Sequence, residues 1–200
     1  MLAGTHLTIG LASALAICSP GNIDQAAPVI IGAAVGSIIC DMDSRDTSRI
    51  RDALYGRVIG AAVVGITVIW DALLKGVFLE TLMKIPLDRG LIGIVLFALS
   101  AIFAKKSGHR GYSHSLAALI IYAFALYMID ARLVLPFEIG FVSHILLDLT
   151  NKTPIRIFYP VKRGFCFYWF YANRTANAVC MVLGIIWLVY ELNVTAGIAL

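Results

Sequence analysis

Charged side chains are scarce in this chain, and so are cysteines. Asp, Glu, Lys and Arg make up 14% of the 200 residues, whereas a soluble domain normally carries about 25%. The four cysteines form no CxxC pair and no metal-finger spacing, which excludes a disulfide scaffold and a zinc finger. The sixteen Lys and Arg residues lie between apolar runs rather than in one block, so no nucleic-acid partner is expected.

Apolar residues are abundant. They form 60% of the sequence, and the mean hydropathy is +0.88, as is typical of a polytopic membrane protein. We predict an all-α fold in which residues 1–200 form one membrane-embedded domain, a transmembrane helical bundle of about seven spans. The predicted helices cover residues 6–19, 26–40, 57–79, 90–105, 114–131, 137–150 and 176–197. Several are shorter than the roughly 20 residues that cross a bilayer upright.

The basic residues predict the orientation of this bundle. If the predicted helices alternate in direction, twelve of the sixteen Lys and Arg residues fall on one side of the membrane and four on the other. The positive-inside rule then places the richer side in the cytoplasm. That side includes the N-terminus and the segments 41–57, 105–114 and 151–175.

The same alternation gathers the chemically active residues. One side, the cytoplasmic one, receives all four histidines and three aspartates: His6, His109, His114, His144, Asp41, Asp43 and Asp148. Among the histidines, His6 carries the weakest signal by itself, since a single histidine at a helix end is usually satisfied locally.

His144 and Asp148 have the most informative spacing. Residues four apart on a helix face the same direction, so this imidazole and carboxylate could bind one divalent ion. Ionisable residues among apolar neighbours in a membrane helix are costly and usually functional. The alternative is a hydrogen-bonded His–Asp pair that holds two helices together.

The segment 108–115 places His109 and His114 five residues apart, with Arg110 between them. Its two glycines permit a tight turn that brings both rings to one point. The fixed charge of Arg110 suits a phosphate or a carboxylate, and we expect Ser115 to cap the following helix. The alternative is a solvated loop in which the histidines have no shared role.

Asp41 and Asp43 end the second predicted helix. Alternate residues of extended backbone point apart, so one carboxylate would bind a metal while the other orients a ligand. They would instead form a surface salt-bridge cluster if they pair with Arg45, Arg49 or Arg51.

Taken together, these residues predict a centre for one or two divalent ions. Carboxylates with imidazoles suit Zn²⁺, Mn²⁺ or Fe²⁺ better than Ca²⁺ or copper, with Zn²⁺ or Mn²⁺ favoured, and such an ion lowers the pKa of bound water. The predicted metal ligands are His6, Asp41, His109, His144 and Asp148. Asp43 or His114 is the predicted general base or ligand orienter, and Arg110 would hold an anionic group.

At these residues the chain resembles the YdjM family, described as membrane-bound metal-dependent hydrolases and LexA-regulated inner-membrane proteins. The resemblance rests on Thr5-His6-Leu7, Asp41-Met42-Asp43, the block GHRGYSHS at 108–115 and GFVSHILLD at 140–148. It implies that the seven His and Asp residues are the family's polar set, that divalent metal is bound, and that the protein lies in the inner membrane. The family's acidic motif usually reads Asp-x-Asp-His, whereas Ser44 stands here, which puts a second metal position in doubt.

These observations favour a hydrolase that uses a metal-activated water on a phosphoester or a lipid-derived ester, with the lipid bilayer as its surroundings. The alternatives are a non-enzymatic membrane or partner-binding protein with a structural or decayed metal site and, less favoured, an ion transporter. The aromatic run at 165–171 is interpreted as an interfacial belt, with a lid over a lipid substrate as the alternative. The oligomeric state is left open.

Overall fold

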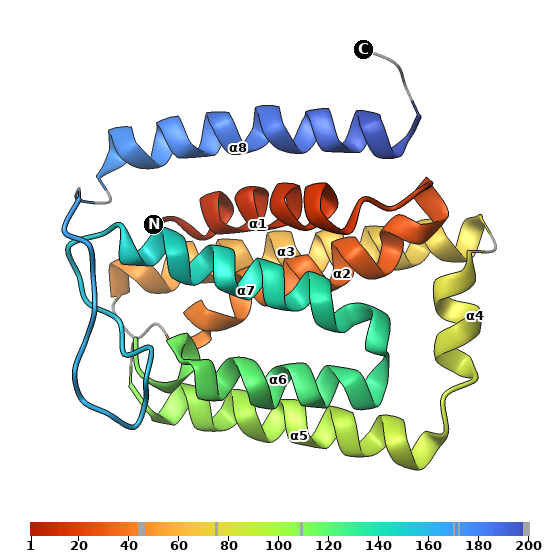
Figure 1. Cartoon of the computed structure of the whole chain (residues 1–200), viewed down its shortest axis with the longest axis horizontal. Helices are drawn as coiled ribbons and strands as arrows, with labels where there is room; N and C mark the ends of the chain where they lie inside the picture. The colour runs from red at the N-terminus through yellow and green to blue at the C-terminus, as the bar shows by residue number, and fades with distance from the viewer. Residues whose placement is uncertain (44–46, 75, 109, 170, 172, 198–200) are drawn as a thin grey trace.

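The computed structural model describes residues 1–43, 47–74, 76–108, 110–169, 171 and 173–197. Within them, regular structure is helical except for one isolated β-bridge between Ile155 and Phe165. The elements in chain order are α1 (Ala3–Cys18), α2 (Ile23–Ile39), η1 (Cys40–Asp43), α3 (Thr47–Leu73), α4 (Val77–Met83), α5 (Leu87–Lys106), η2 (Tyr112–His114), α6 (Leu116–Ile129), η3 (Ala131–Leu133), α7 (Val134–Leu149) and α8 (Arg174–Thr195). The long helices run side by side along one axis, while α4 crosses one end (Figure 1).

Long helices lie close to six of the seven predicted ranges, but the prediction of a single helix over 57–79 is wrong. That helix, α3, starts earlier, at Thr47, and stops at Leu73; α4 follows as a separate element. Asp71 causes the break, since its side chain accepts hydrogen bonds from the amides of Phe78 (3.4 Å) and Leu79 (2.9 Å). Because this buried carboxylate caps the start of α4, the apolar run 57–79 is divided between two helices.

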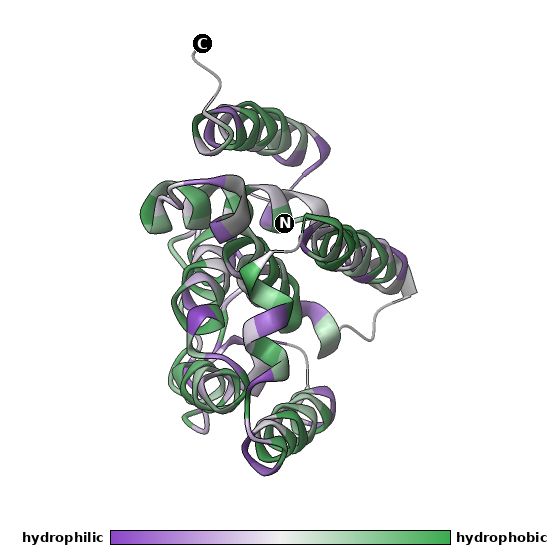
Figure 2. Cartoon of the chain, turned by 90° about the vertical axis from the view of Figure 1, so that its right-hand side faces the viewer, coloured by the Kyte–Doolittle hydropathy of each residue, from purple (hydrophilic) through white to green (hydrophobic). Residues whose placement is uncertain are grey.

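Four stretches are long and apolar enough to cross a membrane: Gln25–Met42, Arg51–Leu73, Leu87–Lys106 and Arg174–Thr195. Helices α1 and α6 are apolar but shorter. Most large apolar side chains of α3, α5 and α8 are exposed, and Figure 2 shows that hydrophobic residues make up most of the length of the helices. Exposed apolar surface of this extent requires a lipid environment, so the protein is membrane-associated. The count of about seven spans stays a prediction.

Helix α2 lies at the centre of the bundle, against α1, α3 and α7. Its contact with α7 is close because Gly32 and Gly36 face the α7 backbone and Gly140 faces α2. A Cβ on Gly140 would lie 2.5 Å from the carbonyl oxygen of Ala33, so only glycine permits this approach. The spacing of Gly32 and Gly36 is the small-residue pattern by which membrane helices pack.

One end of the bundle collects the start of α1, the end of α2 with η1, the η2 turn and the end of α7 (left in Figure 1). The connection from α7 to α8 also passes over this end. It is fixed there by two backbone hydrogen bonds, from Leu116 N to Ile157 O (3.0 Å) and from Arg156 N to Arg110 O (3.1 Å). The arrangement of the helices thus brings four distant parts of the chain together at this end, and the connection covers them.

Candidate metal centre

Six of the predicted site residues meet at this end of the bundle, and five of them, all His or Asp, offer donor atoms for a metal. Their donor atoms form two overlapping groups, each with all atoms within 4.8 Å of one another: His6, His144 and Asp148, and Asp41, His114 and His144. They come from α1, η1, η2 and α7, so the convergence predicted from helix alternation is present. His144 belongs to both groups and is the centre of the cluster.

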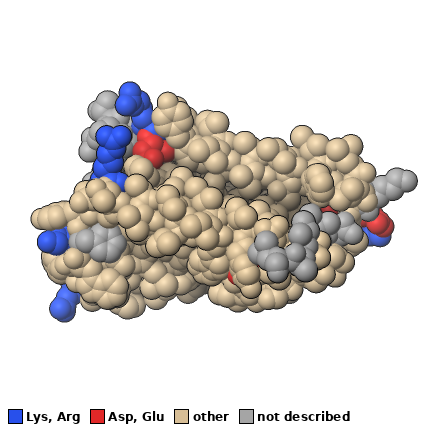
Figure 3. All heavy atoms as spheres, turned by 90° about the horizontal axis from the view of Figure 1, so that it is seen from above, with Lys and Arg blue, Asp and Glu red and all other residues tan. Residues whose placement is uncertain are grey.

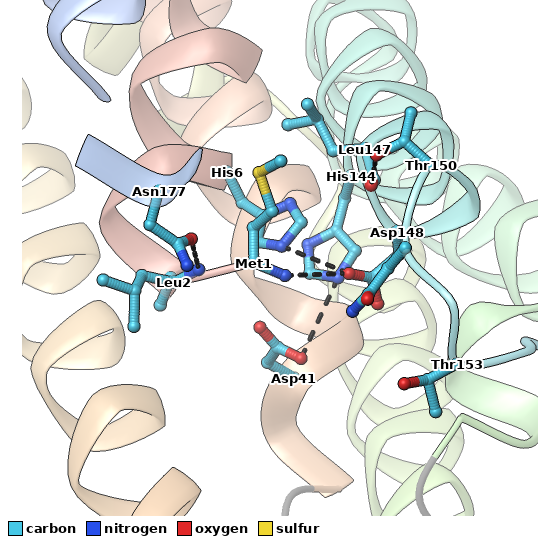
Figure 4. Close-up of polar contacts among 12 residues, drawn as sticks. Met1, Leu2, His6, Asp41, His144, Leu147, Asp148, Thr150, Thr153 and Asn177 are labelled. Atoms are coloured by element: carbon cyan, nitrogen blue, oxygen red, sulfur yellow. Dashed lines mark hydrogen bonds and ion pairs between the residues drawn. The ribbon is translucent and has the colours of Figure 1, made fainter. Parts of the chain in front are cut away.

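Asp148 is surrounded by nitrogen atoms (Figure 4). Its Oδ1 lies 3.1 Å from the amino group of Met1 and 3.6 Å from His6 Nε2. Its Oδ2 lies 3.1 Å from Arg110 Nη2 and 3.5 Å from His114 Nε2. This carboxylate is 2% exposed, and a buried carboxylate needs such positive or hydrogen-bonding neighbours.

The close packing of α2 and α7 orients His144. Its Nδ1 lies 2.7 Å from the backbone carbonyl oxygen of Ser37. A carbonyl oxygen only accepts, so Nδ1 carries the proton and Nε2 of the neutral ring keeps a lone pair. Nε2 points toward Asp41, whose Oδ1 is 3.9 Å away (Figure 4). Metal-binding histidines are commonly held in this way, by a carbonyl on the other ring nitrogen.

The three histidine rings pack against each other. His6 stacks on His144 with 3.8 Å between ring centroids, and His114 meets the edge of His144 at 5.3 Å. All three are almost fully buried. Among the described residues, His6 Nδ1 and His144 Nε2 have no hydrogen-bond partner.

A buried polar atom without a partner costs about 1–3 kcal/mol. His144 Nε2 lies beside Asp41, and His6 presents its other nitrogen, Nε2, to Asp148. These imidazoles and carboxylates form a donor set that a Zn²⁺ or Mn²⁺ ion would satisfy. The residues present therefore fit a bound metal.

A tight turn places His114. Gly108 has a positive φ of 86° and Arg110 one of 58°, so the permissive turn expected here is present. The Tyr112 hydroxyl, 2.7 Å from Ser100 Oγ, ties the turn to α5, and burial raises the pKa of the Tyr112 phenol. Ser113 Oγ lies 2.8 Å from His114 Nδ1, so this serine holds the ring in place.

Ser115 begins α6 as expected, since its Oγ accepts a hydrogen bond from Ala118 N at 3.2 Å. Arg110 is also buried, and it links the cluster to the connection that follows α7. Besides its ion pair with Asp148, its Nη1 donates to the carbonyl oxygen of Thr153.

The predicted ligand His109 lies outside the described residues, and so does Ser44, which stands where the family usually has a histidine. Asp43 closes η1, but its side chain is also outside the described part of the chain.

Asp41 is the most accessible member of the cluster. Its side chain is 17% exposed, against 0–3% for His6, His114, His144 and Asp148. Asp41 is therefore the one of these five side chains that contacts solvent appreciably.

The family model described as YdjM inner membrane protein matches residues 1–199. The chain belongs to the YdjM family. No curated protein and no solved structure matches the chain. Membership of a family described as inner membrane proteins agrees with the exposed apolar helices, and both support a membrane location.

Sequence reasoning missed two groups that position the histidines. The Ser37 carbonyl leaves no signal in a sequence, because every residue has one; only the small residues nearby indicate that another helix comes close. Ser113 stood beside His114 in the YdjM-like block, and its position between the two histidines was the available signal.

Proposed function

We propose that this YdjM protein is a metal-dependent hydrolase of the inner membrane that acts on a phosphoester or a lipid-derived ester. The observation that carries this proposal is the buried histidine cluster, in which Nε2 of His144, without a hydrogen-bond partner, faces Asp41 and Nε2 of His6 faces Asp148. Such a set of donors suits one Zn²⁺ or Mn²⁺ ion, or two if His109 and Asp43 supply further ligands.

The metal ligands would be His6, Asp41, His144 and Asp148, with His109 as a further ligand. Bound Zn²⁺ or Mn²⁺ would activate a water molecule and polarise the ester oxygen. The Ser37 carbonyl keeps the proton of His144 on Nδ1, so that Nε2 stays available. Asp148 remains ionised because Arg110 and the histidines surround it.

Two roles near the metal fall to other residues. His114 or Asp43 would accept the proton of the attacking water, or orient a ligand; Ser113 fixes the His114 ring for either task. Arg110 would hold an anionic part of the substrate, since it carries a permanent charge beside Asp148 and guanidinium groups pair well with phosphate.

The location of the cluster supports a lipid-derived substrate. It lies where α5 ends at Lys106 and α8 begins at Arg174, the depth of phospholipid headgroups if these helices cross the membrane. We propose a multi-pass topology of about seven spans, with this end in the cytoplasm because twelve of the sixteen Lys and Arg residues belong to it.

The activity is tested with protein in mild detergent, loaded with Zn²⁺ or Mn²⁺ and offered a panel of soluble phosphoesters and phospholipids. Metal-dependent release of product that is lost in the His144→Ala variant supports the proposal. A metal-loaded protein that hydrolyses no phosphoester or ester in the panel would contradict it.

A structural metal site is the second candidate, and the burial of the cluster favours it. Structural sites are closed, whereas catalytic sites keep an open position for water, and three histidines here are almost fully buried. The rate at which a chelator removes the metal distinguishes a catalytic site from a structural one. Metal that a chelator removes within minutes from the folded protein indicates an open site reached through Asp41, and metal that stays bound until the protein unfolds indicates a structural one.

A further inference from the structure

The connection between α7 and α8 has an exposed surface whose residues are not part of the proposed metal centre. We call its residues 152–169, with Tyr171 and Arg174, the aromatic-basic segment. Its exposed side chains are mostly aromatic: Trp169 is 70% exposed, Tyr171 66% and Tyr168 65%. The lid interpretation of the aromatic run conflicts with this exposure, because a lid would turn these rings toward the cluster.

The segment is also strongly basic. No Asp or Glu occurs between Asp148 and Glu191, whereas this stretch holds five basic residues: Lys152, Arg156, Lys162, Arg163 and Arg174. Two of them lie over aromatic rings, Lys152 Nζ at 4.4 Å from the centroid of Tyr171 and Arg163 at 5.7 Å from that of Phe165. Seen from above, Figure 3 shows most of the visible Lys and Arg residues at one end of the molecule.

Backbone hydrogen bonds attach the aromatic-basic segment to the C-terminal end of α7. Phe167 N donates to Leu149 O (2.7 Å) and Trp169 N to Thr150 O (3.2 Å), both at the end of α7. The candidate span Leu87–Lys106 ends at this level and the span Arg174–Thr195 begins there. Exposed aromatic rings and cations at the end of membrane spans lie among the lipid headgroups.

We propose that the aromatic-basic segment is a binding surface for anionic phospholipids. The aromatic rings insert at the interface, while Lys162 and Arg163, both exposed and without an acidic neighbour in sequence, pair with headgroup phosphates. Because the segment is bonded to Arg110 and Leu116, bound lipid also holds the turn that carries His114. This proposal does not require that the metal centre be catalytic.

The test uses the fluorescence of Trp169. The full-length chain, with Trp70→Phe and Trp187→Phe, is kept in a neutral detergent and titrated with phosphatidylglycerol, with phosphatidylcholine or with inorganic phosphate. We expect a saturable change in emission with phosphatidylglycerol and none with the other two. An equal response to inorganic phosphate would indicate a general anion site, and an equal response to phosphatidylcholine only apolar contact; either would overturn the proposal.

Matched variants locate the surface. Lys162→Gln/Arg163→Gln should raise the midpoint of the phosphatidylglycerol titration about 25-fold, since each of the two cations near a membrane surface contributes roughly a fivefold factor. Lys84→Gln/Arg89→Gln removes the same charges at the other end and should leave the midpoint unchanged. Equal shifts in both variants would refute a local surface. The same titration of His144→Ala should resemble that of the parent chain, which keeps the outcome independent of the proposed hydrolase.

Discussion

At the scale of single residues, the two serines that flank His114 have different structural roles. Ser113 holds the imidazole through Nδ1, and Ser115 caps α6. Ser113→Ala should weaken metal binding by about 10–100-fold, the usual cost of losing a group that orients a ligand, with little change in stability. Metal affinity is measured by competition with a chromogenic chelator.

Ser115→Ala provides the control for this prediction. It should lower the free energy of unfolding by about 1 kcal/mol, because a helix cap is lost, and leave the metal affinity of the folded protein unchanged. Metal affinity that falls equally in both variants would show that Ser113 acts only through the fold of the turn.

Asp71 allows a second prediction at this scale. It lies within the candidate span Arg51–Leu73, and ion transport would need acidic groups along a path through such spans. In the structure it caps α4 instead. Asp71→Ala should therefore destabilise the protein by about 1–2 kcal/mol without changing its metal content. Unchanged stability, measured by denaturation in mixed micelles, would contradict the capping role.

Sequence reasoning at the residue scale succeeded where chemistry and spacing coincide. The four-residue spacing of His144 and Asp148 predicted their common face, and the glycines near His114 predicted its turn. It did not predict that Arg110 pairs with Asp148, because an ion pair between residues this far apart in sequence depends on the packing of η2 against α7.

At the scale of elements, the contact between α2 and α7 determines where His144 lies. Gly36→Ala would place a methyl group against the carbonyl of Phe137, and overpacking of this kind costs about 1–3 kcal/mol. As α7 moves away, Nδ1 of His144 loses the Ser37 carbonyl. We expect both lower stability and weaker metal binding.

Gly65→Ala is the matched control, since a Cβ there meets nothing within 4 Å. It should be neutral, or stabilise α3 by up to about 1 kcal/mol through helix propensity. A Gly36→Ala variant as stable as Gly65→Ala would show that the helices separate without cost.

Helix boundaries were harder to predict than helices. Apolar runs predicted the long helices, but they did not predict that α3 begins at Thr47, because its first residues are charged and the prediction followed hydropathy alone. The break between α3 and α4 was not predicted, because the sequence does not distinguish a capping aspartate such as Asp71 from any other polar residue within an apolar run.

At the scale of the whole molecule, the alternation of helices predicted which residues would meet. Because each reversal returns the chain to one end, His6, Asp41, His114 and His144 had to share that end once the number of reversals was right. The number of true membrane crossings does not follow from this, since α1, α6 and α7 are short and a short helix can be buried among others.

Orientation is a prediction that belongs to this scale. In a background with the four cysteines replaced, Arg89→Cys should react with a membrane-impermeant maleimide in intact cells. Lys162→Cys should react only after lysis, because the site end is expected in the cytoplasm. The reverse pattern of labelling would place the metal centre on the outer face.

The most direct test of the central claim is the metal content of the purified protein. Full-length chain in mild detergent, from cells grown with zinc and manganese, is compared by mass spectrometry with a His144→Ala/Asp148→Ala variant of equal helical content. We predict one or two divalent ions per chain in the parent protein and none in the variant. Metal-free parent protein with its fold intact would reduce the cluster to a hydrogen-bonded clamp between helices and contradict the proposed function.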